Sequence, residues 1–276
     1  MPSENYLNSY KSYALQNSEN YSDAKFLPIS PWGLRNWVRE DAIISISQNL
    51  NWQTCIDIGC ASGHTALKLA SLNRNKHVTG SDIGESFVKK AKETSAGLGL
   101  TNCTFIVAEA EKTEINKFFD LVLLAEVIEH VESIEDLFKG INSITRQGSY
   151  LIITCPNLNS DGTLYGRFLR CLGLRKFIAA TDFTPQGTLS HGDQHVREFN
   201  YKSLERSLAR YGWQVKLASG TLIYPLPNYD LFAKVIYNLP GLKHVYRAIE
   251  LFFTLHFGQL SKLFARHLVY VFERKN

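Results

Sequence analysis

The chain has 276 residues, of which 45% are hydrophobic and 20% are charged. This is the composition of a globular protein with one large domain or two small ones, and it excludes a wholly disordered chain or a coiled coil. The net charge of +4 is uneven, because the segment from Lys202 to the end has eleven Lys or Arg against four Asp or Glu, which gives +7. Such a segment could face phosphates, an anionic membrane surface or an acidic substrate, or it could be a solvated helix surface.

Signals for targeting and for disulfides are missing from the sequence. No run of about 18 uncharged apolar residues occurs, so we expect no membrane-spanning helix. The polar N-terminus, MPSENYLNSYKSYALQNSENYSD, lacks the apolar region of a secretory signal. The five cysteines form no CxxC pair, which argues against a disulfide framework or a zinc knuckle. We therefore predict a cytoplasmic protein, and the sequence does not indicate its oligomeric state.

The N-terminal residues 1–34 are rich in Asn, Ser and Tyr. We interpret them as an arm or lid that could fold over a ligand. The apolar spacing then predicts a helix from about Arg35 to Gln48. Trp32, Arg35 and Trp37 could help to close the arm, although packing is the commoner role for a Trp at the start of a helix.

Short apolar strands and helices alternate over the next hundred residues. The predicted strands are Thr54–Ile58, His77–Ser81, Cys103–Val107, Asp120–Leu124 and Ser149–Thr154. The predicted helices are Gly63–Leu72, Glu85–Ala96 and Ile134–Ile144. This alternation is typical of an α/β protein with a parallel sheet that is covered on both faces.

The alternation stops after the fifth strand. Residues 157–195 contain five glycines and no clear periodicity, which predicts an irregular insertion. Residues 224–265 are interpreted as a helical cap insertion between the last two strands, within a single domain that covers 35–276. The remaining predicted elements are a helix at Tyr201–Tyr211, a strand at Trp213–Ala218, helical segments at Tyr229–Tyr237 and Leu242–Phe264, and a strand at His267–Phe272.

The first predicted strand leads into Asp57-Ile-Gly-Cys-Ala-Ser-Gly63. Glycines at 59 and 63 allow a tight turn into the next helix, whose N-terminus suits a carboxylate or a phosphate. The second strand ends at Asp82, which could accept hydrogen bonds from ribose hydroxyls or cap the following helix. Small or acidic residues also follow the third and fourth strands, at Glu109-Ala110-Glu111 and Ala125-Glu126. Ligands of doubly wound sheets bind at this edge, so a binding crevice is predicted there.

These motifs, in this order and at this spacing, resemble the class I S-adenosylmethionine-dependent methyltransferases. The resemblance covers about residues 40–222 and the final strand, with one departure at Ala61, where the family usually has a glycine. It implies a doubly wound, mostly parallel, seven-stranded Rossmann-like sheet with a late antiparallel strand and a helical cap insertion. The motifs are Asp57-x-Gly-x-x-x-Gly63, Asp82, Phe-Ile-Val-Ala-Glu-Ala-Glu111, Phe-Asp-Leu-Val-Leu-Leu-Ala-Glu-Val-Ile-Glu-His130, Ile153-Thr-Cys-Pro-Asn157 and His195-Val-Arg-Glu-Phe-Asn-Tyr-Lys-Ser-Leu-Glu205.

The resemblance also implies S-adenosylmethionine as the cofactor and assigns residues to its parts. Gly59 and the turn at Gly63 would face the amino-acid end, and Asp57 would orient the loop from below. Asp82 would hold the ribose hydroxyls. The other implied cofactor residues are Ile83 beside the adenine, Glu109 and Ala110 along its edge, and Cys60 and Ala125 near the loop.

Glu126-Val-Ile-Glu129-His130 begins where the fourth strand ends. If this segment is helical, the two carboxylates and the imidazole share a face. They then suit Mg²⁺, Mn²⁺, Fe²⁺ or Zn²⁺, and His195 could return as a fourth ligand. The ubiquinone-biosynthesis O-methyltransferases and the small-RNA 3′-end 2′-O-methyltransferases are similar to the chain here. The resemblance implies a metal that holds substrate hydroxyls, with Glu129, His130 and His195 as the catalytic residues.

Alternatives stay open for this motif. His130 could be a general base without a metal, with Glu129 as a cap or core partner, or the motif could be structural. The leading prediction is an O-methyltransferase, metal-assisted, for a small-molecule hydroxyl in a sugar, a phenol or a secondary metabolite. The alternatives are an RNA 3′-end 2′-O-methyltransferase, a metal-independent methyltransferase and a non-catalytic cofactor-binding protein.

The partner expected from these patterns is a small hydroxylated acceptor. Nucleic acid is not expected, because the basic surplus is confined to the C-terminal part of the chain. The aromatic run from Tyr224 to Phe257 could line an apolar acceptor pocket, pack inside the cap or contact a membrane peripherally.

Overall fold

The computed structural model of the chain describes residues 31–112, 115–157, 199–221 and 238–275. Seven strands in these ranges form one sheet in the order β3-β2-β1-β4-β5-β7-β6. The strands are β1 (Thr54–Ile58), β2 (His77–Asp82), β3 (Cys103–Val107), β4 (Leu121–Ala125), β5 (Tyr150–Pro156), β6 (Trp213–Thr221) and β7 (His267–Arg274). Only β7 runs antiparallel to its neighbours, β5 and β6. The predicted seven-stranded, mostly parallel sheet with a late antiparallel strand is confirmed.

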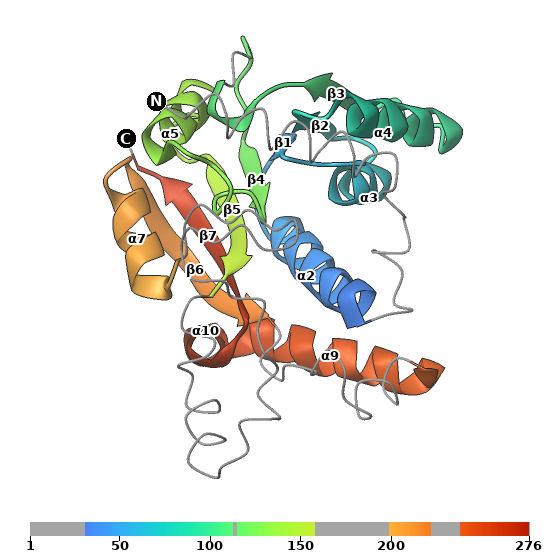
Figure 1. The fold of residues 1–276 in the computed structure, drawn as a ribbon, viewed down its shortest axis with the longest axis vertical. Helices are drawn as coiled ribbons and strands as arrows, with labels where there is room; N and C mark the ends of the chain where they lie inside the picture. The colour runs from blue at the N-terminus through green and yellow to red at the C-terminus, as the bar shows by residue number, and fades with distance from the viewer. Residues whose placement is uncertain (1–30, 113–114, 158–198, 222–237, 276) are drawn as a thin grey trace.

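Helices cover both faces of the sheet (Figure 1). They are α2 (Pro31–Gln48), α3 (His64–Leu72), α4 (Glu85–Gly97), the short 3₁₀ turn η2 (Ala110–Lys112), α5 (Ile134–Ser143), α7 (Tyr201–Ala209), α9 (Pro240–His256) and α10 (Gly258–Phe264). The strand bounds agree with the sequence prediction to within three residues at each end. Helix α2 starts at Pro31 and not at Arg35, because proline is well suited to the first position of a helix.

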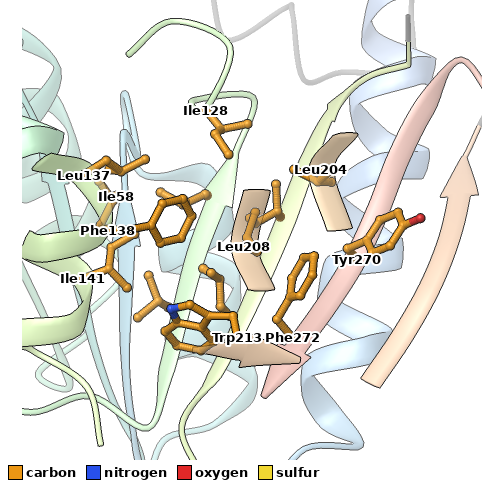
Figure 2. Close-up of a cluster of buried hydrophobic side chains, with 14 of the residues drawn as sticks. Ile58, Ile128, Leu137, Phe138, Ile141, Leu204, Leu208, Trp213, Tyr270 and Phe272 are labelled. Atoms are coloured by element: carbon orange, nitrogen blue, oxygen red, sulfur yellow. The ribbon is translucent and has the colours of Figure 1, made fainter. Parts of the chain in front are cut away.

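The sheet divides the hydrophobic core into two clusters. One lies between the sheet and helices α5 and α7, and it contains Phe138, Leu208, Trp213, Tyr270 and Phe272 (Figure 2). The other lies on the opposite face, under α2, α3 and α4. Its members include Ile43, Trp52, Leu69, Val88, Phe105 and Val271. Leu121–Leu124 is fully buried, and all four of its residues are apolar. This is the pattern of a strand that is buried on both faces.

The predicted insertions are described only in part. Residues 1–30 of the arm, all of 157–195 except Asn157, and the predicted helical segment at Tyr229–Tyr237 lie outside the described residues. The helical segment predicted at Leu242–Phe264 consists of two helices, α9 and α10, which meet at Phe257. Gly258 begins α10 in close approach to β6, where an added Cβ would lie 2.7 Å from the Ala218 carbonyl oxygen.

The cap helices lie at the carboxyl edge of the parallel strands. Strand β6 runs parallel to β5, because both are antiparallel to β7, so its end at Thr221 lies at that edge. Helices α9 and α10 connect this end to the start of β7 (Figure 1). Helix α9 also packs against α2, where Arg247 pairs with Asp41 and stacks on Trp37. Trp37 therefore has the packing role in this structure.

Candidate cofactor and acceptor site

A cavity of about 300 Å³ opens at the carboxyl ends of β1, β2, β3 and β4. This volume is at the lower end of the range for small-molecule binding sites. All of the predicted cofactor residues except Gly63 line it, and so do Glu126 and His130. The lining residues that the sequence analysis did not assign are Arg39, Ala61, His64, Thr65, Phe87, Ala108, Glu111, Val127 and Val131.

The loop between β1 and α3 turns through left-handed backbone. The φ angles are +73° at Gly59, +46° at Ala61 and +82° at Gly63. The N–H groups of Gly59 and Cys60 donate to the Ser81 carbonyl oxygen at 2.7 and 2.9 Å, which ties the loop to β2. An added Cβ at Gly59 would lie 2.5 Å from Cγ2 of Val127. The glycine requirement is therefore both conformational and steric.

Gly63 precedes α3, and its contact with the amino-acid end of the cofactor stays a prediction. It does not line the cavity, and an added Cβ would lie 2.7 Å from the Phe105 ring. Its left-handed φ and this close packing let the helix start directly beneath the loop. It shapes the site from outside the lining.

Asp82 braces the site on the β2 side. Its Oδ2 accepts from the Ala61 N–H at 2.8 Å, and its Oδ1 accepts from the Gly84 N–H at 2.9 Å. Burial raises the pKa of this carboxyl, against the backbone hydrogen bonds from Gly84, Ala61 and Ile83. Each oxygen keeps acceptor capacity, and the side chain lines the cavity. Its role toward a ribose stays a prediction.

Asp57 is a buried carboxyl at the base of the cavity. Burial raises its pKa to about 7, with further contributions from Asp82 and Glu40, while the Ala66 N–H bond lowers it. That hydrogen bond reaches the first turn of α3, so Asp57 orients the helix that follows the loop. Its predicted role under the loop stays a prediction.

The opposite wall comes from the turn after β3. Glu109 pairs with Lys112 at 2.7 Å. Glu111 Oε1 accepts from the N–H groups of Glu132 and Ser133 at 2.7 and 2.9 Å. The Glu111 bonds fix η2 against the segment that leads into α5. Ala110 of η2 lines the cavity together with Ile83.

Glu126 lies at the end of β4 in left-handed backbone, with φ +59°. Its Oε2 is 3.1 Å from Arg39 Nη1 and 2.9 Å from His267 Nδ1, and its Oε1 accepts from the Thr154 hydroxyl at 3.1 Å. Burial alone would raise the pKa of this carboxyl, but His267 and Arg39, with the hydrogen bonds from His267 and Thr154, hold it well below its usual range. The carboxylate thus joins β4 to α2, β5 and β7.

Residues 126–130 form a bend and a turn, so the helical face proposed for the motif does not form. The His130 N–H donates to the Val127 carbonyl oxygen at 2.9 Å. Glu129 is 2% exposed and does not line the cavity, whereas His130 does. His195 lies outside the described residues.

A divalent metal does not fit the described part of this motif. The Glu126 carboxylate is already paired with Arg39 and His267, and Glu129 does not line the cavity. Within 31–112, 115–157, 199–221 and 238–275, no group of three His, Cys, Asp or Glu could hold a metal ion. The same ranges contain no helix with the length and apolar character that a bilayer span requires.

Several lining residues gave little signal in the sequence. Arg39 reaches the site from α2 and meets Glu126 across 87 positions of the chain, so no local pattern marks it. His64 and Thr65 directly follow the glycine loop, and Phe87 follows Asp82 by five positions. Their closeness to motif residues is a signal that could have identified them.

Comparison with known proteins gives a family. A model of the methyltransferase domain matches residues 52–200, which is more than half of the chain. An (S)-tetrahydroprotoberberine N-methyltransferase from Eschscholzia californica is 32% identical over 101 residues, which are 37% of this chain and 29% of that protein. The chain therefore spans less than a third of that relative.

A longer match is to a ubiquinone biosynthesis O-methyltransferase from Sinorhizobium fredii. It is 28% identical over 184 residues, which cover 66% of this chain and 68% of that protein. Among solved structures, magnesium protoporphyrin IX methyltransferase from Synechocystis, with bound S-adenosylhomocysteine, matches with a TM-score of 0.52 at 16% identity, over 88% of this chain and 87% of that one. At this identity the likeness concerns the fold. The chain belongs to the methyltransferase-domain family, and its fold is that of the class I S-adenosylmethionine-dependent methyltransferases.

Proposed function

We propose that the protein transfers a methyl group to a hydroxyl oxygen of a small molecule, with His130 as the general base. The observation that carries this proposal is the position of His130 in the lining of the same cavity as Gly59, Asp82 and Glu109. An imidazole there can take the proton that an alcohol or phenol loses as it is methylated. The similarity to a ubiquinone biosynthesis O-methyltransferase supports the choice of oxygen.

The cavity fits S-adenosylmethionine in the chemistry of its lining. Bound there, this cofactor supplies a methyl group on a positively charged sulfonium. Gly59 contributes backbone to the cavity lining, and the Asp82 carboxylate can accept from two neighbouring hydroxyls. Asp57 and Glu109 add acidic side chains that favour a cationic ligand. These side chains would position the cofactor, since methyl transfer depends chiefly on alignment of the reacting atoms.

No step of the proposal passes through a metal ion. The Glu126 carboxylate pairs with Arg39 and His267. Among the described residues of the predicted ligand set, His130 is the one that lines the cavity without taking part in those ion pairs. His130 would act on the acceptor proton directly. The metal-assisted form of the prediction depends on His195, which lies outside the described residues.

The test is methyl transfer from methyl-labelled S-adenosylmethionine to a panel of phenols, sugars and amines, with the product identified by mass spectrometry. We expect an O-methyl product, and His130→Ala should lower kcat by at least about 100-fold. The same variant should bind S-adenosylhomocysteine like the wild type in calorimetry. His64→Ala is the matched control, because it removes another histidine from the same cavity.

Three results would contradict the proposal. An N-methyl product would overturn the hydroxyl acceptor. Retention of turnover by His130→Ala would overturn the general base. Loss of activity on exhaustive chelation, reversed by Mg²⁺ or a transition metal, would overturn the metal-free mechanism and support metal-assisted deprotonation of the acceptor.

A further inference from the structure

Helix α9 has an unusual distribution of polar and apolar side chains. Its inward positions hold Glu250, which is 2% exposed, and Thr254, which is fully buried. The Thr254 hydroxyl donates to a backbone oxygen, and the two acceptors within range are Gly220 O at 3.1 Å and Glu250 O at 2.8 Å. A helix on the surface of a globular protein normally shows the opposite pattern, with its apolar side inward.

The outward side of α9 and α10 is apolar. Val245, Ile249, Phe252 and Leu260 each expose between 50% and 58% of their surface. The first three follow one another at helical spacings of four and three residues, so they form a stripe. The full set, which we call the outer stripe, is Leu239, Leu242, Val245, Ile249, Phe252, Phe253, Phe257, Leu260 and Leu263.

The segment that carries the outer stripe has more basic than acidic residues. Between residues 238 and 266 the sequence has Lys243, Arg247, Lys262 and Arg266, and Glu250 is the single acidic residue. Arg247 pairs with Asp41 of α2 and Lys262 pairs with Glu205 of α7, so acidic groups of neighbouring helices offset two of these basic groups. Lys243 and the exposed His244 lie in the first turns of α9, next to Leu242 and Val245.

We propose that the outer stripe is a membrane-docking surface, which inserts its apolar side chains into the interfacial region of a bilayer that contains anionic lipids. Interfacial helices combine an apolar face with basic residues in this way. The excess of basic over acidic residues in this segment favours an anionic bilayer as the occupant, because a second copy of the chain docked through the same stripe would carry the same excess. Figure 1 shows α9 at the lower edge of the described helices and strands, beside α2 and α10.

The docking surface is structurally linked to the active-site cavity through α2. Arg247 of α9 contacts Asp41 and Trp37 of α2, and Arg39 of the same helix lines the cavity. Docking through α9 would therefore hold the carboxyl edge of the sheet near the bilayer. The proposal does not depend on which atom accepts the methyl group.

The test is co-sedimentation of the full chain with vesicles of phosphatidylcholine alone and with vesicles of phosphatidylcholine and phosphatidylglycerol at three to one. We expect binding to the anionic vesicles, with weaker binding at high salt. The double variant Ile249→Asn, Leu260→Asn should bind at least about tenfold more weakly, because it removes two inserted apolar side chains. Lys243→Glu should weaken binding by at least about fivefold on anionic vesicles.

The matched control is Leu72→Asn, Leu98→Asn. These side chains are 54% and 55% exposed, and they lie at the ends of α3 and α4, away from the outer stripe. The control should bind vesicles like the wild type. Thermal melting and S-adenosylhomocysteine binding, measured on every variant, show that the fold and the cofactor site are intact.

Each contrary outcome overturns the proposal. If the wild type binds neither vesicle and forms a dimer that the Ile249→Asn, Leu260→Asn variant abolishes in sedimentation velocity, the stripe is a contact between two copies. If the wild type is monomeric and binds neither vesicle, the stripe is not a docking surface for either. Equal vesicle binding by the stripe variant and by the control also contradicts it.

Discussion

The carboxylate of Glu126 lies 2.9 Å from Nδ1 of His267, so the end of β4 is joined to the start of β7 across the intervening strand β5. Arg39 approaches the same oxygen from α2 at 3.1 Å. Three elements far apart in sequence thus meet at one side chain. Because Glu126 also lines the cavity, these ion pairs fix the position of α2 relative to the cavity wall.

The Arg39–Glu126 pair should contribute measurably to the free energy of unfolding. Arg39→Met and Glu126→Gln combined in a double-mutant cycle should give a coupling of about 1–2 kcal/mol in urea unfolding, because both side chains are largely shielded from water. The exposed Lys139–Glu135 pair is the control, and its coupling should be about 0.5 kcal/mol or less, although its 2.7 Å separation is shorter. Equal couplings for the two pairs would contradict this view.

Two substitutions in the β1–α3 loop should change stability in opposite directions. Gly59→Ala should destabilise by about 1–3 kcal/mol, because its Cβ would meet Val127 and its φ is +73°. Ala61→Gly should be neutral or stabilising by up to about 1 kcal/mol, since Ala61 already has φ +46°. Urea unfolding measures both. Adding Val127→Ala to Gly59→Ala should recover the steric part of the loss, and no recovery would mean that the backbone conformation alone is responsible.

Asp82 should affect cofactor affinity and stability separately. Asp82→Asn should weaken S-adenosylhomocysteine binding at least about tenfold in calorimetry, with a small loss of stability, because the amide oxygen still accepts one backbone N–H. Asp82→Ala should show the same affinity loss and a further destabilisation of about 1–3 kcal/mol.

Asp120 provides the control for Asp82. Its Oδ2 accepts from the N–H groups of Gln53 and Thr54 at 2.8 and 2.9 Å, outside the cavity. Asp120→Asn should therefore lower stability and leave cofactor affinity unchanged. Unchanged affinity in Asp82→Asn would contradict its role toward the ribose.

The regular elements could be predicted because they depend on local patterns. Strands β1 and β3 have the predicted bounds, since each is a short apolar run next to a turn. The cofactor crevice followed from the rule that ligands bind at the carboxyl ends of parallel strands. Gly59 and Asp82 could be selected as site residues from their positions alone, after β1 and at the end of β2.

The side-chain pairings of the Glu126 motif could not be predicted in the same way. The i, i+3, i+4 spacing places the three side chains on one face only if the segment is a helix. The left-handed φ at Glu126 excludes a helix that starts at this residue. The partners Arg39 and His267 are distant in sequence, so the use of the carboxylate as an ion-pair hub depends on tertiary packing. The outward apolar side of α9 was likewise hidden, because its composition alone is equally consistent with a packed core.

The buried Asp57 carboxyl should make stability depend on pH. Its pKa in the folded chain is raised to about 7, mainly by burial, while an exposed Asp titrates near pH 4. Between about pH 4 and 7 the folded chain holds a proton that the unfolded chain has lost, so stability falls as the pH rises, by up to about 1.4 kcal/mol per pH unit. Above about pH 7 both states are ionised and the dependence on this group ends.

Asp57→Asn should remove this dependence, because the amide carries no charge and can still accept from the Ala66 N–H. In urea unfolding the variant should gain stability relative to the wild type as the pH rises from 4.5 to 7, and the difference should then stay constant to pH 8.5. Glu93→Gln, at an exposed position of α4, controls for the loss of one negative charge. Parallel pH profiles for the wild type and Asp57→Asn would show that the carboxyl is already ionised in the folded chain at pH 5.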